Sequence, residues 1–280
     1  MLGKRDTTLL LLSLSFTLLC TLCSTLLSQV TSTTIQSSAD PSLDDILVRL
    51  QKNLIRYKTT VPNFFCDEHV VSELHASGRP FIYTVTDSTF RLERSDASPL
   101  ELKESREIKL INKKPETAQT LKGPAIFTGA FSDALDILSL DRKRCYDYHL
   151  GPSQRVHHKV LLVIDYTLKD TAIDDQSCPG PERHNGAAFI DPENMQVMRL
   201  EMHTPNHKIS PGTYASWTWS IDYAPVVFDN EPFWMPTTIT SRAEGITQRQ
   251  DWSFVATYRN YHKLTVTSKI LPDVDYNPKQ

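Results

Sequence analysis

Residues 214–225, YASWTWSIDYAP, decide the fold class of this chain. Every second side chain in this stretch is apolar: Trp217, Trp219, Ile221 and Tyr223. Because successive side chains of a β-strand point to opposite faces, a period of two predicts a strand with one apolar face that must be covered. The same alternation returns near the end of the chain in Trp252, Phe254, Ala256 and Tyr258.

Further segments with this period lie on both sides of residues 214–225, separated by turn residues. The predicted strands are Phe64–His75, Phe81–Arg94, Leu100–Asn112, Arg142–Leu150, Arg155–Lys169, Ala187–Ile190, Met195–His203, Tyr214–Phe228, Phe233–Arg242 and Gln248–Ile270. The predicted turns are Ser77–Pro80, Gly151–Gln154, Asp191–Asn194 and Asp229–Pro232. We therefore expect about ten antiparallel strands in sequence.

Two helices complete the prediction. Ser42 and Asp45 resemble a capping box, and apolar residues recur at helical spacing from Leu43 to Tyr57, before Pro62 ends the helix. A second, short helix is predicted over Ser132–Leu140, with Ser132 as its cap. The fold class is α+β: a single large curved antiparallel sheet, or unclosed barrel, with an N-terminal helix and a short mid-chain helix. No repeat or linker divides residues 40–280, which we predict to be one domain.

The first 39 residues predict export. Lys4 and Arg5 precede an uncharged, largely apolar run from Leu9 to Leu27, which is typical of a signal peptide. The alternatives are a retained membrane anchor or a lipoprotein, although no small residue precedes Cys20 or Cys23. Cleavage is expected after Ser28 or near Ala39, and the localisation is periplasmic or outer-membrane-associated.

Removal of this leader would leave Cys66, Cys145 and Cys178 in an oxidising compartment. Cys178 lies in the polar loop Asp170–Asn185 and Cys145 lies at the start of a predicted strand. We expect a Cys145–Cys178 disulfide, because such a loop is free to fold back on the sheet. Cys66, in a run of Phe residues, is expected to be a buried small side chain.

Composition and motifs exclude several kinds of chemistry. The net charge is −3 without a basic block, and neither GxGxxG nor GxxxxGK[ST] occurs, so we expect no nucleic acid, nucleotide or other cofactor. No metal site is expected either. His157 and His158 would point to opposite faces of a strand, and His203 and His207, separated by Pro205, are expected to be solvated.

The aromatic faces instead suggest a ligand site. They could be ordinary core, but a strongly curved sheet of this length leaves part of its concave face unfilled, which favours a cavity for an acyl chain or a similar apolar ligand, with Ser132–Leu140 as a lid. The predicted lining residues are Trp217, Trp219, Ile221, Tyr223, Trp252, Phe254, Tyr258, Phe131 and Leu135.

Several motifs resemble a family of exported bacterial proteins of unassigned function. They are residues 61–66 (VPNFFC), 186–201 (GAAFIDPENMQVMRLE), 221–226 (IDYAPV), 233–236 (FWMP) and 258–263 (YRNYHK). The layout of that family is similar to the LolA/LolB-like outer-membrane lipoprotein carriers. The resemblance implies an unclosed β-barrel around helices, with an apolar interior that in LolA and LolB holds lipoprotein acyl chains. The motifs carry over no catalytic residue.

Three functional hypotheses follow. The first is a non-enzymatic exported protein that binds a lipid or another apolar ligand in the concave face of the sheet. The second is an envelope structural or interaction domain with a filled core, a protein partner and no ligand. The third is a hydrolase with an unrecognised site around His158, Asp165 and the Cys178 loop, although no GxSxG or HExxH motif is present.

Overall fold

The structure is a computed structural model that describes residues 41–76, 79–115, 127–156, 158–247 and 250–265. The predicted signal peptide at residues 1–39 and the end of the last predicted strand, residues 266–270, lie outside the described residues. In the part of the chain that is described, no helix has both the length and the apolar character needed to cross a membrane.

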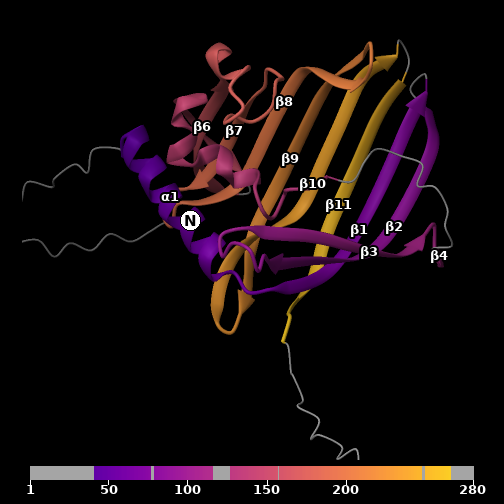
Figure 1. The fold of residues 1–280 in the computed structure, drawn as a ribbon, viewed down its shortest axis with the longest axis horizontal. Helices are drawn as coiled ribbons and strands as arrows, with labels where there is room; N and C mark the ends of the chain where they lie inside the picture. The colour runs from indigo at the N-terminus through magenta and orange to yellow at the C-terminus, as the bar shows by residue number, and fades with distance from the viewer. Residues whose placement is uncertain (1–40, 77–78, 116–126, 157, 248–249, 266–280) are drawn as a thin grey trace, which may run out of the picture. The chain divides into compact units, whose positions relative to one another are not determined.

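One antiparallel sheet of eleven strands forms most of the structure (Figure 1). Its order is β4-β3-β2-β1-β11-β10-β9-β8-β7-β6-β5, so the first long strand pairs with the last, and β4 and β5 lie at the two open ends. The strands are β1 (Phe64–Ala76), β2 (Arg79–Arg94), β3 (Leu102–Ile111), β4 (Lys114–Pro115), β5 (Tyr146–Val156), β6 (Lys159–Leu168), β7 (Asn185–Asp191), β8 (Gln196–Ser210), β9 (Thr213–Phe228), β10 (Glu231–Thr247) and β11 (Gln250–Lys263). The predicted fold class is confirmed.

Helix α1 (Leu43–Thr60) forms where the sequence predicts it. The Oγ of Ser42 accepts a hydrogen bond from the backbone N–H of Asp45 at 3.2 Å, which satisfies one of the free donors at the helix start. Its buried residues share one face: Ile46, Leu47, Leu50 and Leu54. This face packs on the core at one end of the sheet, and β9, β10 and β11 extend well beyond it (Figure 1).

The predicted second helix is two short 3₁₀ helices, η1 (Ala134–Leu138) and η2 (Leu140–Arg144); a third, η3, spans Asp170–Ala172. The predicted cap is wrong, because no side chain caps η1. The N–H and hydroxyl of Ser132 instead donate to the carboxylate of Glu104 on β3. The same hydroxyl lies 2.9 Å from the carboxylate of Asp133, the next residue. It thus contacts two carboxylates and caps no backbone N–H of η1. Ile137 and Leu138 are buried against the core.

The core lies on the inner face of the sheet, defined here as the face that α1 covers. Alternate residues of each long strand contribute to it, as Phe64, Cys66 and Val70 do on β1. The largest side chains buried there include Tyr146, Tyr166, Phe90 and Met235.

One predicted hairpin turn is wrong. Gly151–Gln154 is an irregularity inside β5, and the chain reverses between Val156 and Lys159. His158 lies in this turn, exposed and with a φ of 74°, and not on a strand face toward the core. The Gly-Pro-Ser residues that signal a turn here form a bulge, which inserts extra residues and lets the strand continue.

Candidate functional site

A cavity of about 640 Å³ opens on the inner face of β8–β11, beyond the part of the sheet that α1 covers. Apolar side chains make up most of its wall: Phe127, Met202, Trp217, Trp219, Trp252 and Phe254. The ring of Phe127, from the loop that follows residue 126, lies 5.1 Å from the ring of Trp219 between centroids. A volume of this size and an aromatic lining are typical of sites for small apolar ligands.

Four of the nine predicted lining residues surround this cavity: Trp217, Trp219, Trp252 and Phe254. Four others lie in the packed core: Phe131, Ile221, Tyr223 and Tyr258. Leu135 lies apart from the cavity, in a narrow pocket of about 40 Å³ beside α1 and Trp234. The aromatic stripe of β9 is thus divided, with its first half at the cavity and its second half under α1.

The two indole N–H groups in the cavity wall formed by β9–β11 differ in whether they have a hydrogen-bond acceptor. The Nε1 of Trp217 donates to the Oγ of Ser241 at 2.7 Å. The Nε1 of Trp252 is buried and has no acceptor among the described residues. Neither indole N–H is therefore a free donor for a charged ligand, and the rings of Trp217, Trp219, Trp252 and Phe254 favour an apolar one.

The loop Pro179–His184 forms a second wall, and a side-chain clamp holds it on β8. Glu182 accepts hydrogen bonds from the Nδ1 of His207 at 2.7 Å and from the backbone N–H of Lys208 at 2.9 Å. Burial acts to raise the pKa of Glu182, but these two bonds outweigh it and lower that pKa, which keeps the carboxylate ionised.

His207 contradicts the prediction of a solvated side chain. It is half-buried and its ring lies 4.4 Å from the ring of Trp217. Strand β8 continues through Pro205 with irregular pairing between Thr204 and His207, and this places the imidazole at the cavity. The sequence offered no signal for this beyond the long polar loop that supplies its partner, Glu182.

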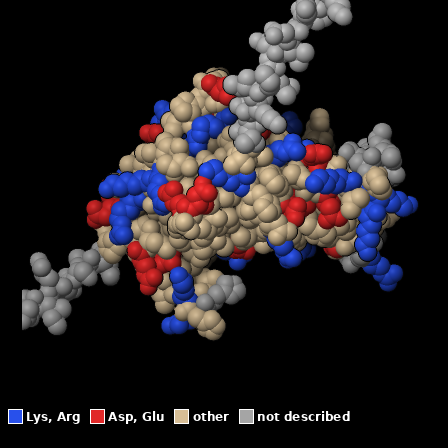
Figure 2. Space-filling view, turned by 90° about the horizontal axis from the view of Figure 1, so that it is seen from below, with Lys and Arg blue, Asp and Glu red and all other residues tan. Residues whose placement is uncertain are grey.

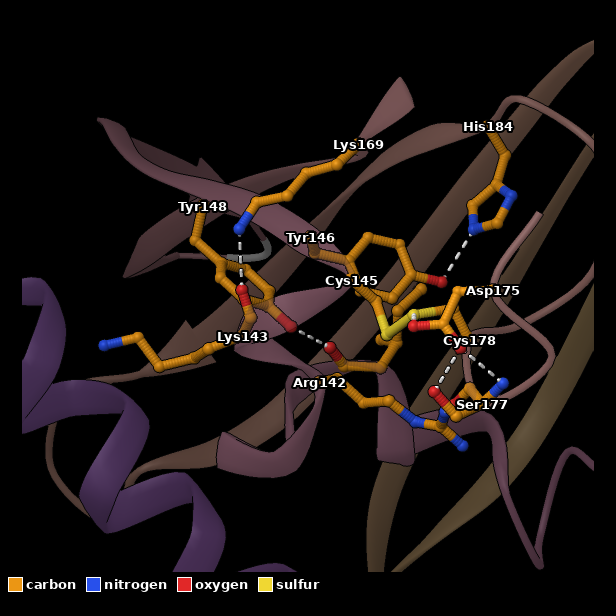
Figure 3. Close-up of a disulfide and its surroundings, with 11 residues drawn as sticks. Arg142, Lys143, Cys145, Tyr146, Tyr148, Lys169, Asp175, Ser177, Cys178 and His184 are labelled. Carbon is orange, nitrogen blue, oxygen red and sulfur yellow. Dashed lines mark hydrogen bonds between the residues drawn. A yellow bond between two sulfur atoms is a disulfide. The ribbon is translucent and has the colours of Figure 1, made fainter. Parts of the chain in front are cut away.

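The predicted disulfide between Cys145 and Cys178 is confirmed (Figure 3). Their Cα atoms lie 5.7 Å apart, and the bond ties the end of η2 to the loop that becomes the second wall. Arg142 strengthens this connection, because its guanidinium donates to the carbonyl of Ser177 at 2.6 Å. The loop is therefore anchored at Cys178 and again at Glu182.

His184 forms the end of the same wall. A hydrogen bond joins its Nε2 to the hydroxyl of Tyr146 (Figure 3), at a distance of 2.7 Å, and its Nδ1 lies 2.8 Å from the carbonyl of Glu182. Both contacts are satisfied by a neutral ring that donates from Nδ1 and accepts at Nε2. Burial lowers the pKa of His184, which favours this neutral form.

The loop Phe127–Ser132 forms the third wall, and hydrogen bonds from side chains of β3 to its backbone hold it in place. Glu104 accepts from the backbone N–H groups of Gly129, Phe131 and Ser132 at 2.8–2.9 Å. Arg106 donates to the carbonyl of Phe127 at 2.9 Å.

Arg106 itself is fixed by a buried pair. Its Nε lies 2.8 Å from Glu68 on β1, and the hydroxyl of Tyr258 on β11 donates to the same carboxylate oxygen at 2.9 Å. A chain of polar contacts thus runs from β11 to the loop that carries Phe127.

A second hollow of about 610 Å³ adjoins the cavity and shares Phe127, Met202 and Trp219 with it. Charged side chains line its far end: Glu104, Asp133, Asp136 and Arg142. Lys58 of α1 lies 2.6 Å from Asp136. The two hollows together make an elongated site with an apolar end and a charged end, which suits an amphiphile.

The residues of the hydrolase hypothesis are not brought together. His158 lies in the β5–β6 turn, and Asp165 is exposed on β6. They are seven positions apart in extended chain, which spans roughly 20 Å. Among the residues that the structure describes, no three His, Cys, Asp or Glu side chains are placed to hold a metal ion.

No family model matches the chain, and no curated protein matches it. Solved structures that resemble it include a putative outer membrane lipoprotein-sorting protein domain from Vibrio parahaemolyticus, with 10% identity over 80% of this chain and 94% of that chain and a TM-score of 0.38. A LolA superfamily protein from Nitrosomonas europaea has 10% identity over 79% and 94%, with a TM-score of 0.40. A DUF1329 family protein from Desulfovibrio piger has 11% identity over 79% and 95%, with a TM-score of 0.37. One of them belongs to the LolA superfamily, to which the layout of the motif-bearing exported family is similar.

Proposed function

We propose that this protein is a non-enzymatic exported binding protein that holds the acyl chain of a lipid, or a similar apolar ligand, in the cavity on β8–β11. The observation that carries the proposal is the cavity of about 640 Å³ with Trp217, Trp219, Trp252 and Phe254 in its wall. Contact between water and such an apolar lining is unfavourable in free energy, and an apolar ligand that displaces this water binds favourably.

Export is part of the proposal. Residues 1–39 are proposed as a signal peptide and residues 40–280 as the exported domain. The Cys145–Cys178 bond supports this, because structural disulfides persist in oxidising compartments. Sequencing the N terminus of the protein isolated from cells tests it, and an N terminus at Met1 would contradict it.

Titration with a fluorescent fatty acid tests the binding proposal, using protein from which bound lipid has been extracted. We expect uptake that saturates at one molecule per chain. Trp217→Ala and Trp252→Ala should each weaken it. Each substitution deletes roughly 60 Å² of apolar contact, which at about 25 cal/mol per Å² corresponds to roughly tenfold in Kd.

Trp234→Ala is the matched control, because Trp234 is also half-buried but lies in the pocket beside α1, outside the cavity. It should lower stability without changing Kd. If none of the proteins shows saturable uptake, or if all three variants weaken it equally, the proposal is wrong and the cavity residues serve only packing.

A further inference from the structure

We propose that the outer face of β1, β2 and β11, at the end of the sheet that carries β4, docks on an anionic lipid surface. This face is on the opposite side of the sheet from the cavity, so the inference goes beyond the proposed ligand site and is tested without it.

The face carries aromatic side chains that no described residue covers. Phe81 and Tyr83, two residues apart on one face of β2, are 69% and 55% exposed. Val255 of β11 is 42% exposed. Val71 of β1 pairs with Val255 on one side and with Val85 of β2 on the other, so these three valines connect β11 to β2 on the same face. We call these five side chains the outer apolar patch. Single exposed apolar residues are common on protein surfaces, but a contiguous set marks an interaction site.

Unpaired cations border the outer apolar patch. Asn112 bonds to Val85 through both its backbone and its side chain, which places Lys113 and Lys114 beside the patch. Lys109 on β3 and Arg79 at the start of β2 are exposed as well. Figure 2 shows Lys and Arg side chains at this end of the molecule, to the right as in Figure 1, as well as farther along the visible face among Asp and Glu.

The carboxylates nearest to these cations contact other side chains. Asp87 pairs with His69 at 2.7 Å and Glu107 pairs with Arg91 at 3.0 Å. Glu73 pairs with His75 at 2.7 Å. Within the described ranges, Arg79, Lys109, Lys113 and Lys114 have no carboxylate partner. Arg91 cancels the charge of Glu107, whereas the neutral imidazoles beside Asp87 and Glu73 do not cancel theirs. The four cations outnumber these two carboxylates, so the patch has a net positive border that complements an anionic surface.

A lipid surface fits this combination better than the other roles that lysines play at a sheet edge. Lysines there also deter pairing with foreign strands, but that role gives no reason to expose Phe81 and Tyr83. Aromatic side chains that insert at the headgroup level, with lysines that contact anionic headgroups around them, are the usual means of interfacial binding. The cavity faces the other way, so docking would leave it open.

Cosedimentation with vesicles tests the proposal, using vesicles of phosphatidylcholine alone and of phosphatidylcholine mixed with phosphatidylglycerol. We expect binding to the mixed vesicles that weakens with added salt, and weaker binding to the neutral ones. Lys113→Glu and Lys114→Glu together should weaken binding at least thirtyfold, since each lysine near an anionic surface contributes about fivefold. Phe81→Ser and Tyr83→Ser together should weaken it by about tenfold.

Tyr214→Ser and Val227→Ser form the matched control, because both are exposed apolar residues of β9 away from the patch. They should leave vesicle binding unchanged, and all the proteins are prepared with the same N terminus, so that the N-terminal segment contributes equally to each. Equal binding by wild type and both patch variants would overturn the proposal. Self-association without vesicles that Phe81→Ser and Tyr83→Ser abolish would overturn it too, and would make the patch a contact between copies of this chain.

Discussion

Removal of the Cys145–Cys178 bond should both destabilise the protein and loosen one wall of the cavity. The bond closes a loop with a sequence separation of 33 residues. From the loss of chain entropy in the unfolded state, a loop of this length corresponds to about 4 kcal/mol of stability at 25 °C. For a domain of this size that is roughly a 10 °C fall in the unfolding midpoint.

Urea unfolding of Cys145→Ala/Cys178→Ala measures this directly. Cys66→Ala is the matched control, because it also removes buried sulfur but opens no loop. We expect a loss of about 4 kcal/mol for the double variant and about 1 kcal/mol for the control. Equal losses would show that packing of the sulfur atoms, and not closure of the loop, stabilises this region.

The same variant should also bind the fluorescent fatty acid more weakly. Without the disulfide, the loop Pro179–His184 keeps its contacts at Glu182 and His184 but loses its anchor at Cys178. An unchanged Kd in a folded double variant would refute the role assigned to this loop as a wall.

Three further predictions concern stability. The lowered pKa of His184 means that the unfolded chain takes up its proton first, so stability should fall as the pH drops below about 6.5; thermal unfolding between pH 7 and pH 5 measures this, and His184→Gln should flatten the dependence. Glu104→Gln should cost about 3 kcal/mol in urea unfolding, because a buried carboxylate that accepts three backbone N–H groups becomes an amide that can accept at only one atom; a loss below about 1 kcal/mol would contradict this. Gly186→Ala should cost about 2 kcal/mol, since a Cβ there would collide with the carbonyl of Glu201 and the hydroxyl of Tyr166; wild-type stability of this variant would mean that β7 shifts at no cost.

Local signals in the sequence account for the parts of the fold that were predicted correctly. Helix α1 depends on Ser42, on a period of 3.6 and on Pro62, all within about 20 residues of each other. The strands of β9 and β11 follow from alternation within each segment. The disulfide was predictable because few cysteines lie beyond the predicted signal peptide and one of them lies in a long loop.

The errors share a different cause, because each depends on contacts with another segment of the fold that the residue pattern at the site does not reveal. Ser132 is a good cap in isolation, but Glu104 on β3 takes its hydroxyl. Gly151–Gln154 has the residues of a turn, yet pairing with β6 carries the strand through it. The burial of His207 depends on Glu182, 25 positions away, and no pattern within β8 reveals this.

The candidate site shows the same division. Alternation placed Trp217, Trp219, Trp252 and Phe254 on one face, where the structure has the cavity. The alternation could not distinguish these cavity residues from the core residues Ile221 and Tyr223, because the position of α1 decides which part of that face is covered. The loop walls were beyond prediction as well, since Glu104 and Glu182 hold them through contacts distant in sequence.

Native mass spectrometry of the protein purified from cells, without detergent or added lipid, tests the proposed binding most directly. We predict that the exported chain carries a lipid adduct of defined mass, which organic extraction removes and which Trp217→Ala and Trp252→Ala lose while Trp234→Ala keeps it. A spectrum of the bare chain alone, from a preparation that also fails to take up fatty acid, would contradict it.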